Sequence, residues 1–220
     1  MKEHTSMRVG GKADIYMEPD SIDELIYFIK YLREKTIPYF LIGNGTNLLV
    51  SDDGIRGAVI RLGDRIAKVE VSDNKIIAEC GALLSGISKT AAENSLSGME
   101  FANGIPGSVG GAVFMNAGAY GTEMKDIVEK VEVLDSDLKL GVLDNKQMEF
   151  GYRKSIINKG QHITTKVFFS LKKGNYNEIK KTMEELNEKR KEKQPLDYPS
   201  AGSIFKRPEG YFAGKLIEDA

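Results

Sequence analysis

The spacing of glycine constrains this chain more than any other feature of its sequence. Of the 23 glycines in 220 residues, seven fall within the 24 positions from Gly98 to Gly121. Glycine lets the backbone turn through positive φ and lets another group lie directly against the main chain. We therefore expect this segment to contact a ligand; a tightly packed core turn is the alternative.

The composition is that of a globular protein with a large core. The length suits one large domain or two small interlocked ones. The 31 basic and 32 acidic residues give a formal net charge of −1, which argues against a nucleic-acid binder and against attraction to an anionic membrane. No apolar run approaches the roughly 20 residues of a membrane helix, and the residues after Met1 do not resemble a secretory signal. The only cysteine, Cys80, cannot form an internal disulfide, so we expect the cytosol as the compartment.

The apolar pattern predicts two successive α+β units followed by a charged helix. Strands are expected at residues 13–17, 39–42, 48–50, 58–62, 67–71, 76–80, 128–134, 138–143 and 163–171. Helices are expected at about residues 22–34, 85–94 and 175–194. The first helix starts at a Ser21 capping box and completes a βαβ unit, and Pro195 ends the last one. Both ends of the sequence look cut, because residues 212–220 begin a helical pattern and stop without a cap.

A first glycine loop at residues 43–48 reads GNGTNL. It matches two glycines of the dinucleotide fingerprint, but Leu48 takes the third position and an expected strand follows, which disfavours a Rossmann domain. The loop also lacks the Lys-Ser/Thr pair of a P-loop. Its amides, with Thr46 and Asn47 as further donors, suit a phosphate; an ordinary Asn-Gly turn is the alternative.

The second glycine loop, within residues 104–121, has glycines three apart, then an apolar run and Asn116-Ala117-Gly118. It suits an anion at a helix N-terminus and a flat ring against small residues.

Elsewhere the spacing is less informative. Ser203 lacks a nucleophile elbow, and His4 and His162 with Cys80 have no metal-ligand spacing, so we predict no structural metal.

Six ordered motifs carry a family resemblance. They are residues 7–11 (MRVGG), 43–49 (GNGTNLL), 104–111 (GIPGSVGG), 116–121 (NAGAYG), 152–155 (YRKS) and 202–208 (GSIFKRP). The chain resembles the UDP-N-acetylenolpyruvoylglucosamine reductase family (UDP-N-acetylmuramate dehydrogenase, MurB) along its whole length, and most of all the shorter type II branch. The resemblance implies an α+β fold with an FAD-binding domain of the vanillyl-alcohol oxidase and p-cresol methylhydroxylase type. That domain is expected at residues 6–171, with subdomains at about 6–65 and 66–171, before an incomplete substrate domain at 172–220.

The resemblance also implies a reaction in peptidoglycan precursor synthesis. NADPH reduces FAD, and the enolpyruvyl ether of UDP-N-acetylglucosamine is then reduced to UDP-N-acetylmuramate. Arg153 matches the arginine that stabilises the enolate, and Ser203 matches the proton donor. The residues that match substrate or NADPH contacts are Tyr152, Arg190, Lys193 and Arg207. We expect non-covalent FAD at Gly43, Asn44, Gly45, Thr46, Asn47, Leu48, Gly81, Ala82, Ile105, Pro106, Gly107, Ser108, Gly110, Gly111, Asn116, Ala117, Gly118 and Ala119.

Two departures from the family keep alternatives open. The family's helical segment before the first strand and its C-terminal stretch with a catalytic glutamate have no counterpart here, so we expect a fragment or a truncated gene product. One alternative is therefore an FAD-binding remnant with little or no turnover. A sugar or alcohol oxidase of the same flavin superfamily is a weaker alternative. Many such oxidases tether FAD to a histidine or cysteine, and neither glycine loop contains a histidine.

Overall fold

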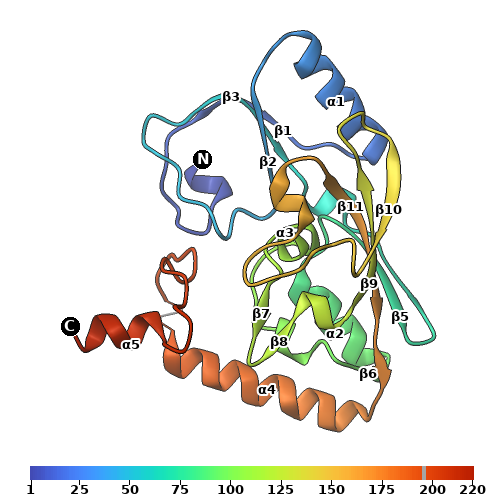
Figure 1. Cartoon of the computed structure of the whole chain (residues 1–220), viewed down its shortest axis with the longest axis vertical. Coiled ribbons are helices and arrows are strands. Elements are labelled where there is room, and N and C mark those ends of the chain that lie inside the picture. Colours follow the sequence, from blue (N-terminus) through green and yellow to red (C-terminus); the bar gives the residue numbers. More distant parts are fainter. Residues whose placement is uncertain (195–196) are drawn as a thin grey trace.

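Two sheets organise the computed structural model, which describes residues 1–194 and 197–220 (Figure 1). The first is parallel, in the order β1-β3-β2: β1 (Ala13–Met17), β2 (Tyr39–Ile42) and β3 (Ile55–Arg61). The second is antiparallel, in the order β10-β9-β11-β5-β4: β4 (Val69–Ser72), β5 (Lys75–Glu79), β9 (Val128–Leu134), β10 (Leu140–Asp144) and β11 (Ile163–Ser170). Two small ladders join β6 (Leu96–Ser97) to β12 (Lys172–Lys173) and β7 (Gly118–Ala119) to β8 (Thr122–Glu123).

The helices are α1 (Ile22–Glu34), α2 (Leu84–Glu93), α3 (Val109–Phe114), α4 (Tyr176–Lys193) and α5 (Ala213–Glu218). With the two sheets they confirm the predicted α+β class. Within the described residues, no helix combines the length and apolar character that a membrane crossing requires.

Helix α1 has the predicted bounds because its signals are local. Ser21 is the N-cap, and its side chain accepts a hydrogen bond from the Glu24 amide. The Glu24 carboxylate accepts from the Asp20 amide (2.6 Å) instead of completing the expected reciprocal box with Ser21. Leu25 and Ile29 are fully buried and belong to the core under the first sheet.

One predicted strand is wrong, and the expected βαβ unit has a different strand order. Residues 48–50 form no strand. Val50 is buried in a small apolar cluster with Val59, and packing there explains the apolar run without ladder pairing. Strand β3, whose central residues 58–60 are fully buried, lies between β1 and β2, so those two strands are not neighbours.

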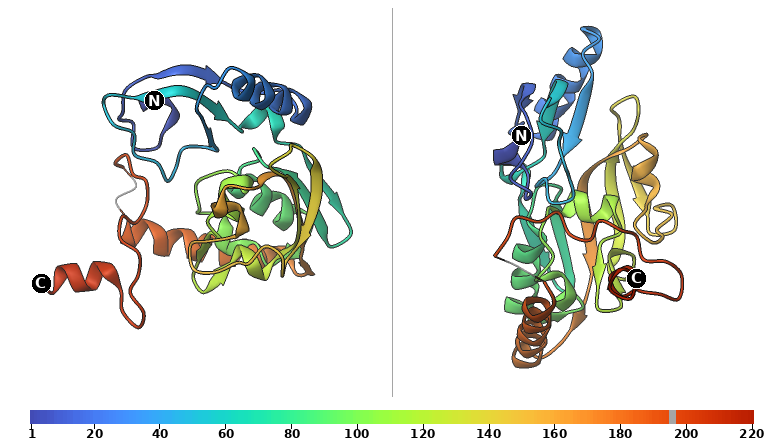
Figure 2. Two further views of the ribbon diagram at one scale, coloured as in Figure 1. Left: turned by 45° about the horizontal axis from the view of Figure 1, so that its top comes forward. Right: turned by 90° about the vertical axis from the view of Figure 1, so that its left-hand side faces the viewer.

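The largest core lies between the five-stranded sheet and helices α2 and α3. Helix α4 packs beside it, with Ile179 and Met183 buried against Ala92 of α2. After α4 the chain turns back toward the first sheet before α5, as both views of Figure 2 show. The hydroxyl of Ser6 donates to the carbonyl of Ser200, which joins this returning segment to the N-terminal part of the chain.

Candidate FAD site

The two glycine loops, 60 residues apart in sequence, touch each other. The Thr46 hydroxyl donates to the Pro106 carbonyl (3.3 Å), and a Cβ on Gly43 would collide with Ser108 Oγ. Gly107 has φ +125°, a conformation that L side chains rarely adopt. Glycine is therefore required where the first loop, after β2, meets the second, before α3.

The loops present unpaired amides where they meet. Within residues 1–194 and 197–220, the backbone N–H groups of residues 44–47, 107 and 108 donate to no other protein group. In contrast, the first amides of α3 are used, because Val109 donates to the Ala82 carbonyl and Gly110 to the Cys80 carbonyl (both 2.8 Å). The N–H groups available to an anion thus lie in the loops. We expected the N-terminus of α3 to bind an anion, but the free donors are those of residues 107 and 108, just before the helix.

These features fit FAD, whose pyrophosphate needs several N–H donors and close approach to the main chain. Ala82 and Leu84 bond to the second loop and to the start of α3. The Ala82 carbonyl accepts from Val109 N (2.8 Å), and Leu84 N donates to the Gly107 carbonyl (3.0 Å), while a Cβ on Gly81 would collide with the Gly63 carbonyl on the other side. The segment after β5 therefore fixes the second loop from behind.

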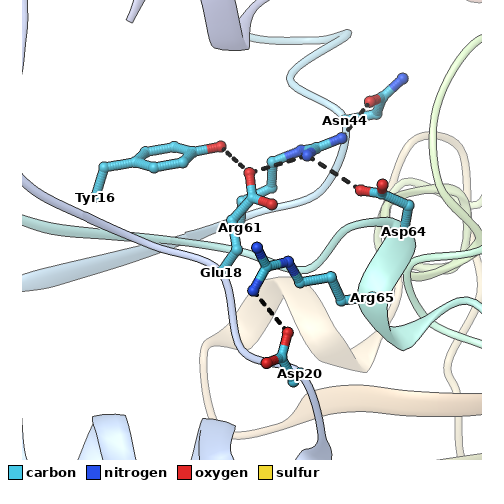
Figure 3. Close-up of polar contacts among 7 residues, drawn as sticks. All are labelled: Tyr16, Glu18, Asp20, Asn44, Arg61, Asp64 and Arg65. Carbon is cyan, nitrogen blue, oxygen red and sulfur yellow. Dashed lines mark hydrogen bonds and ion pairs between the residues drawn. The ribbon is translucent and has the colours of Figure 1, made fainter.

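An ionic network orients the first loop (Figure 3). Strand β2 ends opposite Arg61, so the loop leaves the sheet beside this side chain. Arg61 donates to the Glu18 carboxylate (3.0 Å) and to Asn44 Oδ1 (3.3 Å), and the Tyr16 hydroxyl donates to Glu18 (2.7 Å). The sequence does not identify Arg61 as a residue that supports the site; its only signal there is an arginine at the end of an apolar strand.

The same network perturbs two pKa values. The hydrogen bond from Tyr16, against the opposing effect of burial, and then the bond from Arg61 lower the pKa of Glu18. Burial and the bond to Glu18 raise the pKa of Tyr16. Both shifts favour an ionised Glu18 beside Arg61 and a neutral, donating Tyr16.

The segment after α3 is held by a buried amide. Asn116 is fully buried with φ 42°, and its side-chain amide is bonded to three protein groups. Its main-chain N–H also donates to Val113 O (3.2 Å), so these bonds fix the segment in place. Ala117 N donates to Ala112 O (2.8 Å), and Gly118 and Ala119 form β7.

Arg153 stands on a tight turn. Gly151 and Lys154 exchange both backbone hydrogen bonds (3.0 and 3.1 Å), which leaves Tyr152 and Arg153 at the tip. Arg153 has φ 55°, and its guanidinium carbon lies 5.0 Å from the Tyr152 ring centroid. Arg207 joins them: its amide donates to the Tyr152 hydroxyl (3.1 Å), and its guanidinium lies 5.8 Å from the same ring.

The structure thus gathers Tyr152, Arg153 and Arg207, which the sequence predicts as site residues. Ser203 lies four residues before Arg207 and is exposed. Its hydroxyl donates to the Phe205 carbonyl (3.1 Å), and in the described part of the chain it has no hydrogen bond to Arg153.

Arg190 lies beside the second glycine loop. A Cβ on Gly104 would be 3.1 Å from Arg190 Cδ, and a cavity of about 280 Å³ is lined by Gly104, Pro106, Asn187, Arg190 and Lys191. Burial lowers the pKa of Arg190. Lys193 is exposed at the end of α4 and does not line this cavity.

Comparison with known proteins agrees with this geometry. The FAD binding domain model matches residues 13–140, and the model of the UDP-N-acetylenolpyruvoylglucosamine reductase C-terminal domain matches residues 194–220. The fold and these two family models therefore define the chain as an FAD-binding oxidoreductase.

Two curated relatives carry the name UDP-N-acetylenolpyruvoylglucosamine reductase. That from Caldanaerobacter subterraneus subsp. tengcongensis is 60% identical over 220 residues, and that from Clostridioides difficile 52% over 219; each match covers 100% of this chain and 72% of the relative. The crystal structure of UDP-N-acetylenolpyruvylglucosamine reductase (MurB) from Thermus caldophilus matches with a TM-score of 0.82 and 39% identity, over 99% of this chain and 77% of that one.

The chain belongs to the UDP-N-acetylenolpyruvoylglucosamine reductase family, which confirms the resemblance read from the sequence. FAD is its cofactor, and its reaction class is the reduction of an enolpyruvyl UDP-sugar in peptidoglycan synthesis. The reductase interpretation fits these relatives better than the oxidase alternative.

Proposed function

We propose that this chain takes hydride from NADPH, in the cytosol, to reduce the enolpyruvyl ether of UDP-N-acetylglucosamine. The observation that carries the proposal is the meeting of two glycine loops with unpaired amides, in a chain 60% identical along its length to a named reductase. FAD, when bound, supplies hydride transfer between the nicotinamide and the substrate.

In this proposal, FAD is bound without a covalent link, its pyrophosphate against residues 43–48 and 104–111. Arg61 supports the first loop through Asn44, and residues 81–84 support the second from behind. Residues 6–171 form the FAD-binding domain, with subdomains at about 6–65 and 66–171, and residues 172–220 begin the substrate-binding domain.

Arg153 stabilises the charge that develops on the substrate. Hydride added to the terminal carbon of the enolpyruvyl group leaves negative charge on the adjacent carbon and its carboxylate, so a fixed cation there lowers the barrier. The turn at residues 151–154 fixes the backbone of Arg153, and its guanidinium carbon lies 5.0 Å from the centre of the Tyr152 ring.

Ser203 supplies the proton. A hydroxyl is a weak acid at neutral pH, but the enolate formed by hydride addition is a strong base, which makes the transfer favourable. The Ser203 hydroxyl donates to Phe205 O in the structure. It must exchange this bond for one to the substrate when the substrate binds.

The substrate diphosphate binds among cations near Tyr152. Arg207 lies against the Tyr152 ring, and Arg190 lies beside Gly104 with its charge partly desolvated, a state that favours pairing with an anion. Lys193, one helical turn after Arg190, contributes from the exposed end of α4.

Stopped-flow measurement of the two half-reactions tests the role of Ser203. Ser203→Ala should leave FAD reduction by NADPH nearly unchanged and slow reoxidation by substrate by about 10²- to 10⁴-fold, because only that half-reaction needs the proton. Ser170→Ala, an exposed serine at the end of β11, is the control and should alter neither rate. An equal effect of Ser203→Ala on both half-reactions would remove Ser203 from the mechanism.

A further inference from the structure

The turn that carries Arg153 is attached to the main chain just after α3. Arg153 has φ 55°, which costs free energy for a residue with a Cβ. Such a conformation persists only where the surrounding structure holds it, and it is commonest at functional sites. Two buried side chains, Asn116 and Ser155, supply the hydrogen bonds that hold this turn.

Asn116 is bonded through every polar hydrogen of its side chain. Its Nδ2 group donates to the Gly151 carbonyl (3.1 Å) and to the Glu123 carboxylate (3.0 Å), while Oδ1 accepts from the Lys125 amide (3.0 Å). The Gly151 carbonyl also accepts from Lys154 N, the bond that closes the turn. Asn116 therefore fixes the first residue of the turn.

Ser155 fixes the other end. Its hydroxyl donates to the carbonyl of Phe114, the last residue of α3 (3.0 Å), and the residue is only 4% exposed. The turn at residues 151–154 is thus bonded at both ends to the chain at and just after the end of α3: Asn116 bonds to Gly151 at its start, and Phe114 bonds to Ser155 directly after its end.

Helix α3 links this attachment to the second glycine loop. Its N-cap, Ser108, belongs to that loop, and its six residues rise about 9 Å in total. The Cys80 carbonyl accepts from Gly110 N (2.8 Å) and holds the helix from the side. A group bound at residues 107–108 and the Arg153 turn are therefore attached to opposite ends of one short rigid element.

We propose that Asn116 and Ser155 are positioning residues that, through α3, set the place of Arg153 relative to the ligand bound by the second glycine loop. The inference rests on the proposed role of Arg153 in the reaction. It gives the side chain of Asn116 the role of supporting the turn.

The test compares two losses of a buried serine hydroxyl. Ser155→Ala removes the bond to Phe114 O, and Ser88→Ala removes an equivalent bond to Met99 O (2.8 Å) in the same core, away from Arg153. Both should lower the melting temperature, and Ser155→Ala by more, because Ser155 also belongs to the capping box of the short helix at residues 156–159. Ser155→Thr, which keeps the hydroxyl, should restore the behaviour of the parent chain.

The first readout needs no flavin. Amide hydrogen exchange of Gly151 and Lys154 in the FAD-free protein should be at least about 10-fold faster in Ser155→Ala, because opening the turn exposes these bonds. It should be unchanged in Ser88→Ala. Equal exchange in the two variants would overturn the inference.

The second readout is the rate of flavin reoxidation by saturating substrate. A displacement of about 1 Å costs up to 10²-fold in rate, so we expect a 10- to 100-fold loss in Ser155→Ala, with FAD affinity and reduction by NADPH unchanged. Asn116→Gly, which suits the positive φ and removes all three side-chain bonds, should lose more. If Asn116→Gly does not fold, Ser155→Ala alone decides the matter.

Arg153→Lys separates the two proposals. If it reoxidises at the parental rate, the proposed role of Arg153 is wrong and the positioning inference is overturned with it. If it is slow while Ser155→Ala reoxidises like Ser88→Ala, only the positioning inference is overturned. If Arg153→Lys and Ser155→Ala each slow reoxidation, adding Ser155→Ala to Arg153→Lys should cause little further loss, because the guanidinium that Ser155 positions is already absent.

Discussion

Replacing Gly107 by alanine is the most direct perturbation of the place where the two glycine loops meet. Gly107 has φ +125°, a region that only glycine populates at little cost. A Cβ there would also lie 3.0 Å from Thr46 Oγ1, whose bond to Pro106 joins the loops. The alanine either stays strained or moves the amides of residues 107 and 108, and each response costs about 1–3 kcal/mol.

If that cost falls on the FAD-binding conformation, FAD affinity drops about 5- to 150-fold. Titration of the FAD-free protein with FAD, followed by flavin fluorescence, measures this directly. Gly160→Ala is the matched control: φ is +76° and a Cβ would meet nothing within 4 Å, so it carries a backbone cost away from the loops. We expect both variants to melt at lower temperature and only Gly107→Ala to bind FAD weakly. Gly107→Val should purify without yellow colour.

Parental FAD affinity in Gly107→Ala, or equal weakening in Gly160→Ala, would refute the placement of the pyrophosphate. Full flavin in purified Gly107→Val would do the same.

Three further predictions concern other residues of the site and core. Glu18 has a lowered folded-state pKa, so its stabilisation is present above the ordinary value of roughly 4.3 and is lost as the pH falls through the folded value. Glu18→Gln should therefore lower the urea midpoint more at pH 7 than in acid; the same difference at every pH would contradict the lowered pKa. Burial raises the pKa of Cys80 to about 12, so thiol reagents at pH 8 should label it only as fast as the chain opens, and rapid labelling of the native protein would contradict its burial. Arg190→Gln and Lys193→Glu should leave FAD content intact and weaken UDP-sugar binding; unchanged binding would assign both side chains to the helix surface, and loss of flavin would contradict the domain division.

Local signals explain the elements that the sequence predicts well. Helix α1 has its predicted bounds because a capping serine precedes a regular apolar period. Strand β9 is also predicted residue for residue, and the β4–β5 hairpin is shifted by one or two positions because strand ends depend on pairing partners. In each case the information lies within the element itself.

What the sequence does not predict depends on tertiary contacts. The run at residues 48–50 is apolar because Val50 packs in a small cluster, a pattern that periodicity cannot distinguish from a strand. The glycine loops are separately visible in the sequence, but their contact through Thr46 and Pro106 requires the fold. The same holds for Asn116: the motif shows an asparagine beside small residues, and only the structure shows its amide bonded to the Arg153 turn.

The central claim, that this chain reduces an enolpyruvyl UDP-sugar through FAD, is tested most directly by anaerobic absorbance spectroscopy of the purified protein. We predict that NADPH bleaches the visible absorbance band of the oxidised flavin. Addition of UDP-N-acetylglucosamine enolpyruvate should then restore the band in the absence of oxygen. A bleached band that the substrate does not restore would contradict the claim.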